Sequence, residues 1–264
     1  SGALWCNTIF VEICDMAKKK NITKMKCPSV FNQNEGQTNA HKIKCRVLIV
    51  CEGLKTEPNY FKSFHMMENS GGLVFEITNA GGGINTIKVV QKAIELRDKA
   101  IGDKKPYDIT WAVFDKDSFD ADKFDNAIKM ANSNGIRCAW SNEAFELWYI
   151  YHFENRITPM SRNEYAHKIT TLVREKQKLK TGKKSTFVYK KNDPEMRSIL
   201  LGCGCNEQQA IRWAKEQSES FDAQDYHSHN PCTKVYELVE LLLGEDKVFN
   251  EKIRAIMTKR GCKQ

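Results

Sequence analysis

The sequence predicts an α/β fold with a parallel sheet flanked by helices, followed by a helical C-terminal extension. Through residue 140, short β-branched apolar runs alternate with amphipathic helical segments, as in right-handed βαβ units. From residue 143 onward the apolar spacing is mostly helical. The chain has 264 residues, of which 41% are hydrophobic and 28% charged, so it is not a disordered, collagenous or coiled-coil protein.

The first two strands and two helices follow from local patterns. The apolar run 47–50 is typical of a strand that is buried on both faces. Thr56 is the predicted cap of the next helix, which has a glutamate and a proline in its first turn. Residues 73–78 are predicted as a second strand. Apolar residues at spacings of three, four and seven then predict a helix over about 84–101.

Similar local patterns predict the remaining strands and helices. A third strand is predicted over 109–114, and a helix that follows it is expected to stop at Gly135. A fourth strand is predicted over 136–140. Helical spacing then dominates in 145–152 and again in 235–242.

Charge and apolar spacing together predict three parts of the chain. We expect residues 1–45 to be a leader and a basic flexible arm, with a natural start at Met16. Residues 16–46 hold eight Lys or Arg and one acid, a net +7 of the total +8. This arm is suited to contact with phosphate backbones, or alternatively is a solvated tail. The α/β domain is predicted over 46–153 and the helical extension with its basic loop over 154–264.

Composition also bears on location. No segment approaches the roughly 20 apolar residues that a membrane span needs. The ten cysteines are irregularly spaced and follow no export signal, which favours reduced thiols in a cytoplasmic protein without membrane contact. A zinc site is an alternative for some of them, although the first pair lacks the usual zinc-binding spacing. Its members would be Cys203, Cys205, His227, His229 and Cys232.

Acidic residues follow two of the predicted strands. Glu52 comes after the first strand, and Asp115 and Asp117 come after the third. The carboxyl ends of parallel strands meet at one edge of a sheet, so these side chains converge if the two strands are neighbours. Clustered carboxylates are suitable ligands for Mg²⁺ or Mn²⁺ and predict metal-assisted attack on a phosphodiester. The alternative for each motif by itself is a helix cap or a turn.

Basic residues provide candidate contacts to nucleic acid. The segment 176–191 has seven lysines and no acid, with Phe187 and Tyr189 as candidates for base stacking. The alternative is a solvated loop. Neither G-x-G-x-x-G nor a P-loop motif occurs, so a dinucleotide enzyme or a P-loop ATPase is not supported. The predicted nucleic-acid-binding residues are Lys55, Lys116, Lys180, Lys183, Lys184 and Lys190.

Four motifs, in their order and approximate spacing, resemble the RloB-like protein family. They are residues 47–61 (VLIVCEGLKTEPNYF), 113–117 (VFDKD), 141–148 (SNEAFELW) and 230–233 (NPCT). The resemblance covers about 45–245. It implies a Toprim-like α/β fold, the catalytic fold of topoisomerases, primases and OLD-type nucleases.

The resemblance also implies roles for individual residues. In that pattern Glu52 acts as acid or base near the metal, while Asp115 and Asp117 hold Mg²⁺. Glu146 matches a family glutamate and is a further candidate for binding the metal or positioning a phosphate. Leu54 stands where the family usually has an acidic residue, which removes one possible extra ligand.

The expected function is therefore that of a Mg²⁺-dependent nuclease acting on DNA or RNA. The resemblance further implies prokaryotic antiphage defence beside an AAA-type or ABC-type ATPase partner. The alternative is a catalytically silent nucleic-acid-binding or partner-binding module on the same fold. Leu54 and the Glu143-Ala144 pair, where the family has proline and a small residue, favour this alternative. The sequence leaves open the choice between DNA and RNA and the oligomeric state.

Overall fold

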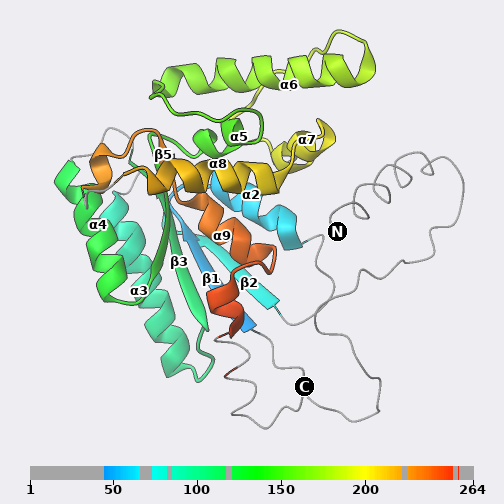
Figure 1. The fold of residues 1–264 in the computed structure, drawn as a ribbon. Helices are drawn as coiled ribbons and strands as arrows, with labels where there is room; N and C mark the ends of the chain where they lie inside the picture. The colour runs from blue at the N-terminus through cyan, green and yellow to red at the C-terminus, as the bar shows by residue number, and fades with distance from the viewer. Residues whose placement is uncertain are drawn as a thin grey trace, which may run out of the picture. The chain divides into compact units, whose positions relative to one another are not determined.

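A five-stranded sheet forms the centre of the fold, with the strand order β2-β1-β3-β4-β5 (Figure 1). The first four strands are parallel, and β5 is antiparallel to β4. This confirms the predicted α/β class and is consistent with a Toprim-like fold. The strands are β1 (Cys45–Cys51), β2 (Leu73–Asn79), β3 (Ile109–Asp115), β4 (Arg137–Asn142) and β5 (Cys232–Thr233). The computed structural model describes residues 45–65, 73–81, 85–116, 121–221, 225–251 and 255.

The register of the sheet brings the ends of β1 and β3 together. Cys51, the last residue of β1, pairs with Asn79 of β2 on one side and with Val113 of β3 on the other. Residues that follow β1 and β3 therefore emerge at the same edge of the sheet. This adjacency is the condition on which the predicted convergence of the acidic residues depended.

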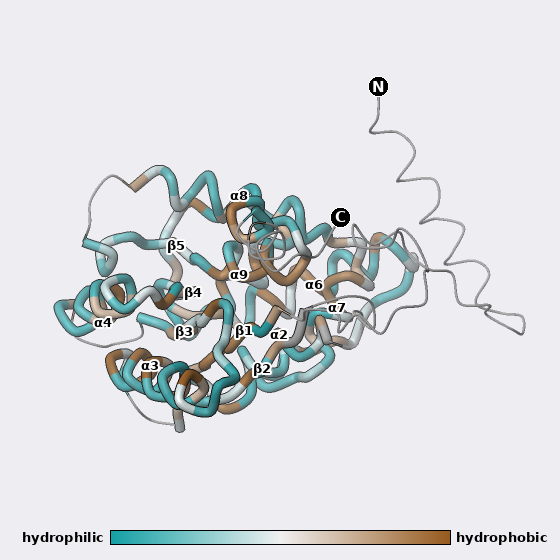
Figure 2. The backbone as a smooth tube through the Cα atoms, turned by 90° about the horizontal axis from the view of Figure 1, so that it is seen from below, coloured by the Kyte–Doolittle hydropathy of each residue, from teal (hydrophilic) through white to brown (hydrophobic). Residues whose placement is uncertain are grey.

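Helices cover both faces of the sheet. Leu48 and Val50 are buried in one layer, while Val47 and Ile49 point the other way and are buried in the second. Two views place α3 and α4 on one side of the strands, and α8 and α9 on the other (Figure 1, Figure 2). The first layer holds α3 (Thr86–Gly102) and α4 (Ala121–Ser133), and the second includes α2 (Thr56–His65), α5 (Glu146–Tyr151), α8 (Glu207–Glu219) and α9 (Val235–Leu242).

Two helix ends differ from the predictions. Thr56 is the first residue of α2, and its hydroxyl donates to Asn192 Oδ1 at 3.3 Å instead of capping the helix. The helix α6 (Tyr165–Thr181) includes the first three lysines of the predicted basic loop and ends at Gly182, which has a φ of 70°. Lysine is a good helix former and glycine tolerates the left-handed conformation, so the loop begins only after residue 181.

The helical extension completes the core on one face of the sheet. Trp111 and Val113 of β3 share a buried cluster with Leu200 and with residues of α8 and α9. The extension also supplies β5, and the sheet and extension lie in one compact unit. The division between 46–153 and 154–264 stays a prediction. The basic arm lies outside the described residues and also stays a prediction. None of the described helices is long and apolar enough to cross a membrane.

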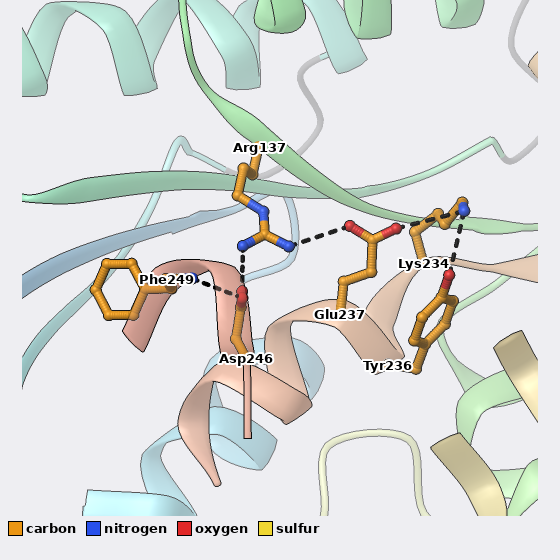
Figure 3. Close-up of polar contacts among 6 residues, drawn as sticks. All are labelled: Arg137, Lys234, Tyr236, Glu237, Asp246 and Phe249. Carbon is orange, nitrogen blue, oxygen red and sulfur yellow. Dashed lines mark hydrogen bonds and ion pairs between the residues drawn. The ribbon is translucent and has the colours of Figure 1, made fainter. Parts of the chain in front are cut away.

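Polar contacts hold α9 against the start of β4 (Figure 3). The guanidinium of Arg137 lies 4.2 Å from the centre of the Trp111 ring. It also lies 3.4 Å from a carboxylate oxygen of Glu237 in α9 and bonds to Asp246 beyond that helix. Arg137 thus holds the C-terminal elements near the amino ends of the strands. The acidic residues lie at the opposite, carboxyl ends.

Candidate active site

Two of the predicted acidic residues meet where β1 and β3 end. The backbone N–H of Glu52 donates to the carbonyl of Val113 at 2.8 Å. The Glu52 carboxylate in turn accepts a hydrogen bond from the backbone N–H of Asp115, with a distance of 3.2 Å to Oε2. The structure therefore brings Glu52 and Asp115 together at the carboxyl edge of the sheet. Asp117 lies outside the described residues, so its place beside them stays a prediction.

Two further glutamates are close enough to act on Asp115 electrostatically. Glu57 in the first turn of α2 and Glu146 at the start of α5 are each only 6% exposed. Burial, then the charges of Glu57, Glu146 and Glu52, raise the pKa of Asp115 well above its usual range. A backbone hydrogen bond from Phe145 opposes this shift. Glu52, Glu57, Asp115 and Glu146 are called the carboxylate cluster below.

Glu57 is a member of this cluster that the sequence reasoning missed. An acid in the first turn of a helix is usually explained by the helix dipole, so no functional role was assigned. Burial and the charge of Glu146 raise the pKa of Glu57, while its own backbone N–H, Lys191 and Arg162 act in the opposite direction. Its Oε2 atom is buried and has no hydrogen-bond partner among the described residues.

Gly53 provides the space for this carboxylate. A Cβ atom at position 53 would lie only 2.0 Å from Glu57 Oε2. The missing side chain directly after Glu52 is the local signal that another group packs there. Sequence reasoning assigned Glu52 to the site, with a turn at Glu52-Gly53 as the alternative, and did not connect Gly53 with Glu57.

Arg162 supplies positive charge to the cluster. It belongs to the short 3-10 turn η1 (Arg162–Glu164) that precedes α6, and its Nη2 atom lies 3.9 Å from Asp115 Oδ2. Nothing in the local sequence marked Arg162 as a site residue, because the contact joins segments about 50 positions apart in the chain.

Tyr189 has a different position from the one predicted. It was expected to be available for base stacking, but its side chain is buried and its hydroxyl donates to Glu146 Oε1 at 3.0 Å. Burial and the Glu146 charge raise the pKa of Tyr189, so the hydroxyl keeps its proton and remains a donor. Tyr189 therefore orients a carboxylate and is not a stacking surface.

The four sequence motifs are neighbours at this edge of the sheet. Lys116, which follows Asp115, donates its backbone N–H to the carbonyl of Ser141 at 2.9 Å. The hydroxyls of Ser141 and Thr233 lie 2.8 Å apart, across the pairing of β4 with β5. Together with Glu52, these contacts connect all four motifs, although they span almost 190 residues of the chain.

The donor chemistry of the cluster fits a hard divalent cation. All of its side-chain donors are carboxylate oxygens, and the unpartnered Oε2 of Glu57 is an available ligand atom. Within the described ranges, however, no three His, Cys, Asp or Glu side chains are already arranged to hold a metal ion. The residues therefore fit Mg²⁺ or Mn²⁺ by chemistry, while their present arrangement is not a complete coordination shell.

The predicted nucleic-acid-binding lysines form two groups. Lys55 is exposed in the loop between β1 and α2, and Lys116 is half-buried directly after Asp115. The remaining ones lie at the end of α6 and beyond. Lys180 donates to the carbonyl of Gly202 at 2.8 Å. Lys183, Lys184 and Lys190 are exposed.

The cysteine and histidine side chains of the zinc alternative do not gather. Cys203 and Cys205 pack with the cluster on one face of the sheet, whereas Cys232 belongs to the cluster on the other face. His227 is paired with Asp125, whose Oδ2 lies 2.8 Å from the ring Nδ1. In the part of the chain that the structure describes, these residues form no metal-binding group.

Comparison with known proteins identifies one family. The sequence model of the RloB-like protein family matches residues 47–242, a range that includes the four motifs and the whole carboxylate cluster. No curated protein and no solved structure matches the chain.

Proposed function

This chain belongs to the RloB-like protein family, and we propose that it is a divalent-metal-dependent nuclease that cleaves phosphodiester bonds of DNA or RNA. The observation that carries the proposal is the carboxylate cluster at the carboxyl edge of the parallel sheet. Carboxylates that are buried together are unfavourable unless a cation compensates their charge. Arg162 and Lys191 both act on this cluster, since each lowers the pKa of Glu57 and Arg162 also pairs with Asp115.

The residues of the cluster suit different tasks. Asp115, with Asp117 as its predicted partner, would hold the cation, and Glu57 and Glu146 are further candidate ligands. When bound, Mg²⁺ or Mn²⁺ supplies a Lewis acid for the phosphate and lowers the pKa of a bound water. Glu52 is the half-exposed member of the cluster, so its carboxylate is accessible for accepting a proton from the attacking water.

Neighbouring groups support this chemistry. The guanidinium of Arg162 lies beside Asp115 and would interact with the oxygens of a phosphate bound at the cluster. Tyr189 keeps Glu146 in one orientation through its hydroxyl hydrogen bond. Defence against phages beside an ATPase partner is the setting implied by the resemblance to the family, and it belongs to the same proposal.

A catalytically silent binding module is the second candidate. It is favoured by the contact of Arg162 with Asp115, because a resident arginine can compensate an acidic cluster without a metal. The lack of a ready three-residue metal site among the described side chains also favours it. The two candidates differ in whether the cluster binds a divalent cation.

Asp115→Asn and Glu52→Gln test the proposal. We expect Asp115→Asn to weaken Mn²⁺ binding at least about 10-fold, because it removes a ligand charge from the cluster. Glu52→Gln should slow cleavage by about 100-fold or more while keeping part of the Mn²⁺ affinity, as expected for loss of a general base. Calorimetric Mn²⁺ titration and cleavage assays on single-stranded DNA, duplex DNA and structured RNA measure these effects. Asp103→Asn, an exposed acid after α3, is the matched control.

Three outcomes would contradict the proposal. If wild-type protein cleaves none of these substrates with Mg²⁺ or Mn²⁺, alone or with a co-encoded ATPase, the binding-module alternative is the better one. If Glu52→Gln cleaves as fast as wild type, the role given to Glu52 is wrong. Unchanged Mn²⁺ affinity in Asp115→Asn would remove the metal site itself.

A further inference from the structure

A basic groove lies where the C-terminal end of α6 faces the helix α7 (Met196–Gly202). It has a volume of about 370 Å³ and is lined by Lys180, Lys183 and Lys184, by the polar residues Gln177, Thr181 and Ser185, and by Ile199 and Gly202 of α7. Among the described residues that line it, none is acidic. Lysines and hydroxyls without acids are the groups that bind phosphates.

The chain leaves this groove and returns along α6 toward the carboxylate cluster. Three contacts with α6 define its path. As the residue number rises along the segment, the number of the contacted residue in α6 falls. Ser185 bonds to Gln177 of α6, the carbonyl of Phe187 accepts from Arg174 at 2.6 Å, and the N–H of Tyr189 donates to Thr170 Oγ1 at 3.0 Å. The segment therefore runs antiparallel to α6, with the side chain of Ser185 and the backbone of Phe187 and Tyr189 in contact with the helix.

The alternate residues of this segment face outward. Ser185, Phe187 and Tyr189 are buried or half-buried, whereas Lys184 and Lys190 are exposed, and the two residues between them that share their side are also exposed. From Lys184 to Lys190 an extended chain spans about 20 Å. This length corresponds to about six phosphates along one strand of a B-form duplex.

Most of the positive charge of the segment has no acidic partner among the described residues, and Lys191 is the exception because it acts on Glu57. Within the described part of the chain, none of its lysines at positions 183, 184, 190 and 191 forms an ion pair. The segment 176–191 also contains no acidic residue. A row of uncompensated lysines attracts a polyanion and releases the counterions bound to it.

The far end of the segment is fixed at the carboxylate cluster. Tyr189 donates to Glu146, and Lys191 is close enough to lower the pKa of Glu57. Asn192 then accepts hydrogen bonds from Thr56 and from Asn59, both in α2. One continuous stretch of chain thus joins the basic groove to the acidic site.

We propose that Lys183, Lys184, Lys190 and Lys191, called the lysine track below, bind the phosphates of a nucleic-acid strand and guide it from the groove to the carboxylate cluster. This inference rests on the proposed nuclease function and adds the route by which the substrate reaches the site. The track binds phosphates only, so it gives affinity and direction without sequence specificity.

A binding assay with matched lysine variants of the full chain tests the track. Lys183→Gln/Lys184→Gln/Lys190→Gln is compared with Lys99→Gln/Lys104→Gln/Lys105→Gln. The control lysines are also exposed and lie around the end of α3, where the chain enters the amino end of β3. Fluorescence anisotropy in EDTA measures binding of labelled DNA and RNA oligonucleotides, single-stranded and duplex, between about 50 and 200 mM salt.

We expect the track variant to bind about 100-fold more weakly at about 0.1 M salt. Its salt slope should fall by about 2 to 3, roughly 0.7 to 0.9 for each phosphate that the variant no longer neutralises. The control variant should change both quantities much less. In the presence of Mg²⁺, the track variant should need more substrate for half-maximal cleavage and keep its rate at saturation, because these lysines do not touch the reacting atoms.

Several results would overturn the inference. They are an equal reduction of affinity in both variants, unchanged binding by the track variant, and no binding of any oligonucleotide by wild type. Poly-glutamate is added as a competitor of a different class. If it binds wild type as tightly as the oligonucleotides, the track serves an acidic protein. Failure of the track appears in binding without metal, whereas failure of the nuclease proposal appears in Mn²⁺ binding and cleavage, so the two are distinguishable.

Discussion

The geometry of the carboxylate cluster depends on the lack of a side chain at Gly53, which leaves room for the Glu57 carboxylate. We expect Gly53→Ala to force the Glu57 carboxylate out of its position, since the new methyl group would lie 2.0 Å from Glu57 Oε2. Overpacking at a buried site costs about 1–3 kcal/mol. Urea denaturation should reveal this decrease in stability, and Mn²⁺ affinity should fall at least about 10-fold.

Gly102→Ala is the matched control, because a Cβ atom there meets no other atom within 4 Å. It should leave stability unchanged or raise it by about 0.4–1 kcal/mol through the unfolded state. Shortening the glutamate in Gly53→Ala/Glu57→Ala should recover stability relative to Gly53→Ala without recovering metal binding. Equal stability of Gly53→Ala and wild type would mean that Glu57 moves away freely and is not held at this position.

Among the helices that surround the site, one buried ion pair joins three elements. Arg197 of α7 bonds to both carboxylate oxygens of Glu207 in α8, at 2.8 and 2.9 Å. Tyr60 of α2 also donates to Glu207, and the guanidinium lies 3.5 Å from the centre of the Phe64 ring. The pair thus connects α2, which carries Glu57, with α7, which borders the basic groove.

We expect Arg197→Met to destabilise the protein by about 3–5 kcal/mol, because it leaves the Glu207 carboxylate buried without its partner. Adding Glu207→Gln should recover much of this stability, since the buried charge is then removed as well. Lys92→Met removes one member of an exposed ion pair in α3 and should cost less than about 1 kcal/mol. Urea denaturation measures all three. Similar effects of Arg197→Met and Lys92→Met would contradict a structural role for the buried pair.

In the molecule as a whole, the helical extension is needed for the core of the sheet. The six buried side chains of α9 alone contribute about 9–18 kcal/mol, at about 1.5–3 kcal/mol for each. This is comparable to the total stability of about 5–15 kcal/mol that is typical of a domain. The predicted α/β part and the extension therefore depend on each other energetically.

We expect a fragment of residues 46–153 to lack a cooperative unfolding transition, and a chain of residues 40–264 to retain one. Near-ultraviolet circular dichroism during heating measures this through the tryptophans, of which Trp111 and Trp148 are fully buried in the shared core. A cooperative transition in the shorter fragment would show that the boundary after residue 153 separates independent domains.

Local patterns were sufficient to predict the elements and part of the site. β1 and β3 were recognised as apolar runs, because a strand buried on both faces needs apolar side chains in both directions. The meeting of Glu52 with Asp115 followed from one rule, that parallel strands end at a common edge. The order of residues along the chain was therefore enough for the fold class and the family resemblance, whereas the meeting of Glu52 with Asp115 also required β1 and β3 to be neighbours, which the structure shows.

Packing between distant segments settled which other groups complete the site. Glu57 looked like an ordinary helix-start residue, and Arg162 and Tyr189 carried no local signal for their contacts with the acids. The end of α6 and the return of the lysine track along it also depend on such packing. The spacing of apolar residues along an element shows which of its faces is buried, because this spacing is a local property of the sequence. It does not record which distant side chain meets that face, because this is fixed only when the elements pack together.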